Sequence, residues 1–208
     1  MKSRSIYQKE IEKRISTLPE GSVFSASDFF DIAATDPTNK ALSRMAASGK
    51  IRRIIQGIYD KPMYSEFLQE YAAPDIDGVA KALAKKYNWT IAPCGDTALN
   101  RLHLSTQVPN VWTYISDGPY KDYSIGKVNL QLKKTANKEI SGKSDITITL
   151  IQALKALGKD RIDDRTIKIL RSELKEHDKK QILTESMTVT GWIRETIREI
   201  VSQEDENV

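Results

Sequence analysis

The hydrophobic positions of the first 35 residues follow helical and extended spacings in turn. Tyr7, Ile11, Ile15 and Leu18 recur every three or four residues, which predicts a helix over residues 3–18. The pair Val23-Phe24 predicts a short strand. A second helix is predicted after this strand, with Ser25 or Ser27 as the N-cap and an apolar side formed by Phe29, Phe30, Ile32 and Ala33.

The stretch DPTNKALSRMAASGKIRRIIQGIYDKP, residues 36–62, predicts a third helix and then a hairpin. Asp36 suits the N-cap, Pro37 suits the first helical position, where no amide donor is needed, and Gly49 suits the end. The runs IRRII and GIYD, hinged on Gln56-Gly57, predict two short paired strands. The helix has an apolar side (Thr38, Leu42, Met45 and Ala46) and a polar side (Lys40, Ser43, Arg44 and Ala47).

Helix, short strand, helix, turn, helix and hairpin is the order of elements in a winged helix-turn-helix domain, which we predict for residues 1–62. Residues 63–74 are predicted to be a linker with some helix, and Pro74-Asp75 begins a helix that reaches about Tyr87. The runs TIAP, VWTYIS and IGKVNLQLKK predict a small antiparallel sheet, and helical spacing returns after residue 145. The predicted class is therefore α+β, with residues 75–208 as a mixed C-terminal domain.

The positive charge of the chain is concentrated in one segment. The 208 residues include 32 Lys and Arg and 28 Asp and Glu, a net charge of +4. Outside residues 36–61 the two signs balance, whereas this segment has six basic residues against Asp36 and Asp60. A positive electrostatic field that is confined to one helix and one hairpin attracts phosphate groups to that surface. A solvated helix face with no ligand remains the alternative.

If this segment binds duplex DNA, the N-terminal half of the predicted third helix enters the major groove. Asn39, Lys40, Ser43 and Arg44 would then lie nearest to the base edges and phosphates, with Arg44 as the candidate reader of guanine. Lys50, Arg52, Arg53 and Gln56 would contact phosphate or the minor groove from the hairpin.

Signals for catalysis, cofactors and metals are weak. The chain has no Gly-rich phosphate loop, nucleophile elbow or paired Cys and His at metal-ligand spacing, so we expect no catalytic residue, cofactor or metal site. Cys94, Asp96 and His103 allow a nucleophile and base, or else a small buried residue, a helix cap and a turn residue. Asp163-Asp164 suits a helix cap.

Aromatic residues of the predicted sheet also allow two interpretations. Beside basic residues they could form a second nucleic-acid surface, or they could pack in or at the rim of the sheet, with the lysines solvated at its edge. The residues concerned are Trp112, Tyr114, Tyr120 and Tyr123, with Lys121, Lys127, Lys133 and Lys134.

The expected compartment is the cytoplasm. The first residues lack the apolar core of a signal peptide, and no run approaches the roughly 18 apolar residues that span a bilayer, so we expect no membrane association. A single cysteine, Cys94, rules out an internal disulfide and suits a reducing compartment.

Two segments resemble a known family. SGKIRRIIQGIYDKP resembles the wing and closing strand of the N-terminal domain of antitoxins from AbiE-type, or type IV, toxin-antitoxin systems. IAPCGDTALNRLHLSTQVPNVWTYISDGP resembles the start of their second domain, and the C-terminal helices are similar only in general order. The resemblance implies a bacterial repressor that binds inverted repeats in its own promoter and counters a nucleotidyltransferase-like toxin.

Two other functions remain open at this stage. The chain could be a stand-alone winged-helix regulator whose second domain binds a ligand or partner, which a neighbouring nucleotidyltransferase gene would argue against. It could also be a nuclease or transferase that uses carboxylates of the second domain. A cluster of acidic residues in one cleft would identify that enzyme.

Overall fold

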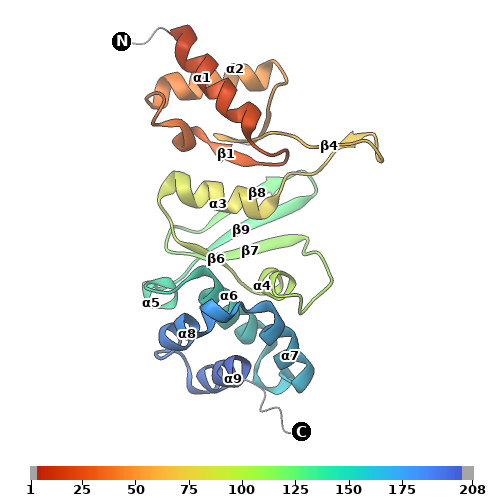
Figure 1. The fold of residues 1–208 in the computed structure, drawn as a ribbon, viewed down its shortest axis with the longest axis vertical. Coiled ribbons are helices and arrows are strands. Elements are labelled where there is room, and N and C mark those ends of the chain that lie inside the picture. The colour runs from red at the N-terminus through yellow and green to blue at the C-terminus, as the bar shows by residue number, and fades with distance from the viewer. Residues whose placement is uncertain (1–3, 203–208) are drawn as a thin grey trace. The chain divides into compact units, whose positions relative to one another are not determined.

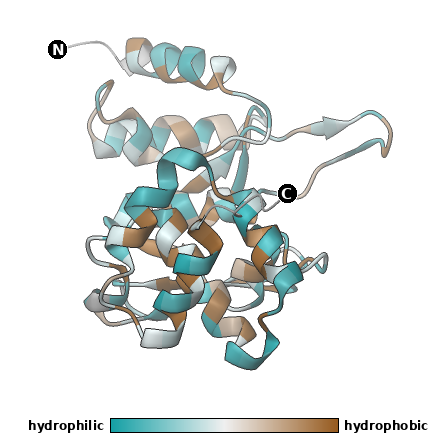
Figure 2. Ribbon diagram, turned by 60° about the horizontal axis from the view of Figure 1, so that its bottom comes forward, coloured by the Kyte–Doolittle hydropathy of each residue, from teal (hydrophilic) through white to brown (hydrophobic). Residues whose placement is uncertain are grey.

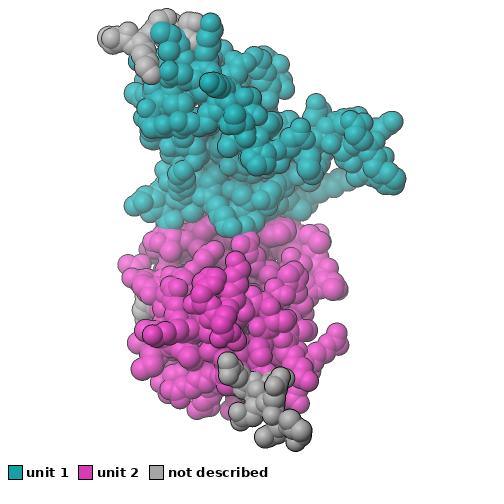
Figure 3. All heavy atoms as spheres, in the orientation of Figure 1, with its two compact units in different colours: residues 1–89, 123–130 teal, residues 90–122, 131–208 magenta. Residues whose placement is uncertain are grey.

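The computed structural model of the chain describes residues 4–202 and contains two compact units. Unit 1 takes the described residues up to Trp89 together with 123–130, and unit 2 takes 90–122 and the described residues from 131 onward (Figure 3). These units divide the chain differently from the predicted boundaries at 62 and 74. The predicted α+β class is confirmed, since helices and small antiparallel sheets occur together.

Unit 1 contains a three-stranded antiparallel sheet in the order β1-β3-β2. Residues of α1, α2 and the sheet share one core, which includes Ile11, Phe24, Leu42 and Tyr59. The elements of this unit (Figure 1) are α1 (Arg4–Thr17), β1 (Val23–Ser25), the 3-10 helix η1 (Ala26–Phe29), α2 (Thr35–Ala47), β2 (Arg52–Ile55), β3 (Ile58–Asp60), β4 (Tyr64–Ser65), β5 (Glu70–Tyr71) and α3 (Ile76–Tyr87).

The predicted first helix, first strand, third helix and hairpin are all present, although Ser3 lies outside the described residues. Helix α2 begins at Thr35, so the prediction that Asp36 is its N-cap is wrong. Pro37 is then third in the helix, where its missing amide still costs no internal hydrogen bond. Gly49 follows the C-cap Ser48 with φ +74, and Lys50 N donates to Met45 O at 3.0 Å, as expected of a helix end.

The predicted second helix is wrong in length, because only the four-residue η1 forms. Ser25 is its N-cap, as predicted, and Ser25 N donates to Asp28 Oδ2 at 2.8 Å. Phe29 is buried and its ring meets Phe24 edge-on at 5.7 Å, whereas Phe30 is 49% exposed. Ala33 is also buried and Ile32 packs against the core, although both lie beyond the end of η1.

The predicted linker with some helix is a two-stranded hairpin, β4–β5, which stands away from the rest of unit 1 (Figure 1). The helix expected from Pro74-Asp75 is α3, whose N-cap Asp75 accepts from Asp77 N at 3.1 Å. Its buried face contains Ile76, Val79, Ala80, Leu83 and Ala84, as predicted.

A second sheet has the order β6-β7-β9-β8, and the division between the units runs through β8 and β9. Strand β8 was not predicted. Tyr114 of β7 is buried as the packing interpretation expects, while Tyr120 is 54% exposed. The strands are β6 (Ile91–Pro93), β7 (Val111–Ser116), β8 (Lys121–Ile125) and β9 (Val128–Lys134).

The helices of unit 2 pack around α6, which is buried from Thr147 to Leu154. Figure 2 shows hydrophobic and hydrophilic residues alternating around its helices, so each has one face for the core. No helix among residues 4–202 is long and apolar enough to cross a membrane. The helices are α4 (Asp96–Arg101), α5 (Asn137–Ile140), α6 (Asp145–Leu157), η2 (Lys159–Arg161), α7 (Asp164–Glu173), α8 (Glu176–Glu185) and α9 (Gly191–Val201).

Glu185 fixes the start of α6 from the end of α8. Its Oε2 accepts from Ser144 N at 2.8 Å and Ser144 Oγ at 2.7 Å, and its Oε1 accepts from Gln181 Nε2 at 2.7 Å. Burial alone would raise the pKa of this carboxyl, but hydrogen bonds from Thr147, Ser144 and Gln181 prevail and lower the pKa from 4.5 to about 2. The carboxylate therefore stabilises unit 2 only while it is ionised.

Glu185→Gln is expected to lower the free energy of unfolding by about 2 kcal/mol at neutral pH, since hydrogen bonds to a charged group are lost. A depressed pKa supplies stability above pH 4.5 that is lost as pH falls toward 2, so the variant's stability should also vary less with pH in that window. Urea unfolding followed by tryptophan fluorescence measures both effects. Glu195→Gln, which removes an exposed carboxylate of α9, is the matched control and should change neither.

Candidate nucleic-acid interface

A groove of about 420 Å³ lies in unit 1 between η1, α2, the β2–β3 hairpin and the last turn of α3. Its walls come from segments up to sixty residues apart in the chain, so folding alone brings them together. The lining residues that carry polar groups on their side chains are Ser27, Thr35, Asn39, Ser43, Arg53, Gln56, Tyr59 and Lys86.

One wall of the groove is a single face of α2. Asn39 and Ser43 are exposed and four residues apart, so their side chains lie one turn above the other. The rotation of the helix is set by its opposite face, where Leu42 and Met45 are buried in the core. Thr38 is also buried on this face, and its Oγ1 donates to the carbonyl of the N-cap residue Ala34 at 2.9 Å.

The opposite wall is the turn of the β2–β3 hairpin, held in place by α3. Lys86 Nζ donates to Gln56 O at 3.2 Å, and the neighbouring Lys85 forms an ion pair with Asp28 of η1. Gly57 has φ +78, and a Cβ there would lie 2.6 Å from Lys86 Nζ. The positive φ favours glycine in this turn, and a Cβ would also displace the flexible end of Lys86.

The groove has one sign of charge. Arg53 and Lys86 are its cations, and none of the described residues that line it is acidic. Around these cations stand amide and hydroxyl groups, which can donate to phosphate oxygens and exchange hydrogen bonds with base edges. The groove can thus bind a polyanion through its cations, and its amide and hydroxyl groups can distinguish one base of that polyanion from another.

Four of the predicted contact residues, Asn39, Ser43, Arg53 and Gln56, come together in this groove. Three others lie elsewhere on unit 1. Lys40 is exposed on α2 outside the lining. Arg44 Nη1 donates to Gln8 Oε1 of α1 at 3.5 Å, and Lys50 forms an ion pair with Glu12 of α1.

Arg52, the eighth predicted contact, has a structural role instead. Its Nε and Nη2 bind the two carboxylate oxygens of Asp60 at 3.1 and 2.5 Å, and its Nη1 donates to Ala72 O at 2.9 Å. The Asp60 side chain is only 1% exposed. Since a guanidinium with these three contacts cannot reach phosphate without leaving a buried carboxylate unpaired, we omit Arg52 from the interface.

Sequence reasoning missed Ser27, Thr35 and Lys86. Thr35 precedes Asn39 by four residues, so helical spacing places both on one face once the helix is known to begin there. Lys86 comes from the end of a helix far along the chain. No local pattern identifies it, because only the packing of α3 against the other elements of unit 1 brings it to the hairpin.

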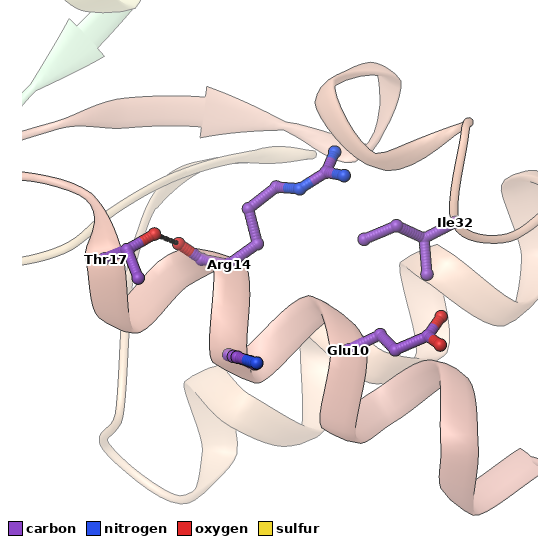
Figure 4. Close-up of a pocket in the computed structure, with 5 residues that line it drawn as sticks. Glu10, Arg14, Thr17 and Ile32 are labelled. Atoms are coloured by element: carbon purple, nitrogen blue, oxygen red, sulfur yellow. Dashed lines mark hydrogen bonds between the residues drawn. The ribbon is translucent and has the colours of Figure 1, made fainter.

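A second pocket of unit 1, about 380 Å³, lies along α1 and is lined by Glu10, Lys13, Arg14, Thr17 and Ile32 (Figure 4). Arg14 Nη1 and Nη2 bind Asp31 at 2.7 and 2.6 Å, and these hydrogen bonds lower the pKa of Asp31. In contrast to the groove, this pocket therefore has an acidic residue in its lining, Glu10, and an arginine that is already paired.

In unit 2, Cys94 is buried among apolar residues that include Ala92, Ile115 and Ile148. Burial raises the pKa of its thiol, which agrees with the buried-residue interpretation rather than with a thiolate nucleophile. His103 lies on a turn, as that interpretation predicts, and its Nδ1 is 2.8 Å from Glu173 Oε1. Asp96 is the first residue of α4 rather than its cap, whereas Asp163 is the cap of α7, as predicted.

Among the residues that the structure describes, no three His, Cys, Asp or Glu side chains come close enough to hold a metal ion. Comparison with proteins of curated function gives no match. A model of one protein family does match, over residues 10–182, which is most of the chain. The chain belongs to this family, described as a family of unknown function, DUF6088.

Proposed function

We propose that the N-terminal part of unit 1 is a winged helix-turn-helix that binds duplex DNA. In this assignment η1 takes the place of the second helix, α2 is the recognition helix and β2–β3 is the wing. The observation that carries the proposal is the groove. In it, Asn39 and Ser43 of α2 and Arg53 and Gln56 of the hairpin line one surface, and none of its described lining residues is acidic. Recognition helices combine such base-reading and phosphate-binding side chains.

We further propose that the protein is a cytoplasmic antitoxin that represses its own operon through inverted repeats and counters a nucleotidyltransferase-like toxin. Support for this part comes from the resemblance of residues 48–62 and 91–119 to antitoxins of type IV systems. The concentration of positive charge in residues 36–61 supports the repressor role.

The double variant Arg53→Ala/Lys86→Ala is expected to bind DNA from the region upstream of its own gene about tenfold more weakly than the wild type. Each phosphate contact contributes about −0.9 to the slope of log affinity against log salt, so the slope should become shallower by about 2. Fluorescence anisotropy at a series of salt concentrations measures both. Arg165→Ala/Lys168→Ala removes the same two residue types from exposed positions of α7 and should leave the slope unchanged.

Equal slopes for the two double variants would exclude the groove as the DNA site. Thermal unfolding of Arg53→Ala/Lys86→Ala is the accompanying measurement, because Lys86 also bonds the hairpin turn. A midpoint within a few degrees of the wild type shows that any loss of binding is a loss of contacts.

Rescue from a neighbouring toxin is expected to be separable from DNA binding. The full-length Arg53→Ala/Lys86→Ala protein, expressed from an unrelated promoter together with the toxin, should permit growth as the wild type does. The full chain is the right test, because the compact units do not divide at the predicted linker. Rescue by the wild type alone would show that the DNA-binding groove also acts in neutralisation.

A second candidate is a stand-alone regulator whose C-terminal part binds a ligand. It is favoured by a pocket of about 270 Å³ in unit 2, whose lining includes Lys143, Lys155, Thr188 and Thr190. The identity of the adjacent gene separates the two candidates, since only the antitoxin requires a nucleotidyltransferase-like toxin beside it.

A further inference from the structure

The hairpin β4–β5 and the residue before it form an apolar arm, residues 63–71. Phe67 is 94% exposed, and Leu68 and Tyr71 are each 61% exposed. Met63 and Tyr64 are exposed as well. Contiguous exposed apolar residues on a projecting strand pair mark a contact site, because natural proteins otherwise protect such edges.

The arm has a defined conformation. Tyr64 and Tyr71 meet edge to face at 5.2 Å across the two strands, and Ala72 N donates to Met63 O at 2.8 Å. Gln69 takes a left-handed conformation, φ +52, which is uncommon for a residue with a Cβ. The base is held to β2 through the bond from Arg52 Nη1 to Ala72 O. A pre-formed arm loses little entropy when a surface covers it.

The charge of the arm excludes DNA as its occupant. Residues 63–73 contain Glu66 and Glu70, both exposed, and no basic residue. Phosphate would repel this segment. A complementary surface must instead be basic, free of acidic groups and partly apolar.

The groove of unit 1 has these properties. It offers Arg53 and Lys86 without an acidic residue among its described lining, and Phe30, 49% exposed, supplies an apolar surface. The pocket along α1 does not fit, because the acidic Glu10 is part of its lining (Figure 4) and Arg14 is already paired with Asp31. Since the base of the arm is fixed on its own unit, the matching groove is that of another molecule.

We propose that the arm of one copy docks in the groove of a second copy, in a reciprocal dimer. Phe67 packs against Phe30, and Glu66 and Glu70 pair with Arg53 and Lys86. In a two-fold arrangement each molecule supplies one arm and one groove. Five large apolar or aromatic side chains per arm, with the surfaces that they cover, bury up to roughly 2,000 Å² in all, within the range of stable interfaces.

The dimer occupies the same groove as the proposed DNA site, so self-association and DNA binding exclude each other. This competition rests on the proposed function, whereas self-association does not. The protein binds DNA as the form in which the groove is open, and DNA in excess would shift the equilibrium from the closed dimer toward that form.

Sedimentation velocity of the full chain without DNA tests the proposal. The wild type is expected to pass from monomer to dimer as its concentration rises. Phe67→Ser should weaken the dimer at least tenfold, and Glu66→Lys/Glu70→Lys should do the same. Met187→Ser, which alters an apolar residue of unit 2 that is 60% exposed, is the control and should not change the dimer.

Exchanging the charges of the arm and the groove tests their pairing more directly than single replacements do. Arg53→Glu/Lys86→Glu alone should be monomeric, and mixing it with Glu66→Lys/Glu70→Lys should restore both arm-to-groove contacts, one in its original and one in its exchanged polarity, and hence a mixed dimer. A monomeric wild type, a dimer that survives Phe67→Ser, or a mixture that stays monomeric would each overturn the proposal. DNA binding that is absent even at concentrations where the protein is monomeric would overturn the proposed function instead.

Discussion

Replacement of Arg52 by alanine is expected to lower the free energy of unfolding by about 3–5 kcal/mol, which is a large part of the stability of a domain of this size. The cause is Asp60, whose side chain is 1% exposed and accepts a hydrogen bond on each carboxylate oxygen from Arg52. Without the guanidinium, a buried carboxylate has lost its counter-charge. The base of the arm also loses its bond to Ala72 O.

Urea unfolding followed by circular dichroism measures this loss, and the next residue supplies the control. Arg53 is exposed, so Arg53→Ala should change stability by no more than about 0.5 kcal/mol. The variant Arg52→Met/Asp60→Leu, which replaces both charges by apolar groups, should recover most of the stability. A loss below about 1 kcal/mol in Arg52→Ala would mean that the ion pair is not what holds the two strands together.

The contrast between Arg52 and Arg53 also shows how far the sequence predicts the site. Neighbouring residues of a strand point to opposite faces, so the sequence implies that only one of the two arginines faces solvent. The sequence does not show which of the two arginines this is. In the structure the register of β2 and β3 places Asp60 opposite Arg52, so Arg52 forms the ion pair, and that register is a property of the folded hairpin.

The elements with strong periodicity were predicted because their apolar residues all enter one core. Ile11 and Ile15 of α1 meet Leu42 and Met45 of α2 there, and helical spacing alone identifies both faces. The predicted linker was wrong because its segment is scarcely buried. Strands β4 and β5 have two residues each, and residues 63–71 leave their apolar groups exposed, so no alternating pattern predicts them.

The place of Lys86 in the groove was not predicted, for a different reason. Lysine near the C-terminus of a helix is common, since it complements the helix dipole, and nothing local separates this residue from Lys85. In the structure Lys85 pairs with Asp28 and Lys86 bonds Gln56 O. The difference arises from which part of unit 1 each side chain meets, which depends on tertiary packing.

Loss of sequence discrimination on Asn39→Ala is the second large effect that we expect. Asn39 is exposed in the first half of α2, the part of a recognition helix that reaches base edges, and its amide can form a bidentate pair with adenine. Such a pair contributes about 1–3 kcal/mol of discrimination, or roughly 5- to 150-fold between the preferred and the wrong base. Binding to unrelated sequences, which depends on phosphate contacts, should hardly change.

Selection from a duplex library with a randomised centre, followed by sequencing, measures this discrimination for the wild type and two variants. Asn39→Ala should lose the preference at one base pair of each half-site and keep the salt dependence of the wild type. Arg44→Ala provides the comparison, because Arg44 lies outside the groove and is bonded to Gln8 of α1. If Arg44 reads guanine, as the sequence suggests, its loss removes a preference at a different base pair. An unchanged preferred site in Asn39→Ala would exclude the exposed face of α2 as the base-reading surface, and with it the orientation that we assign to the winged helix.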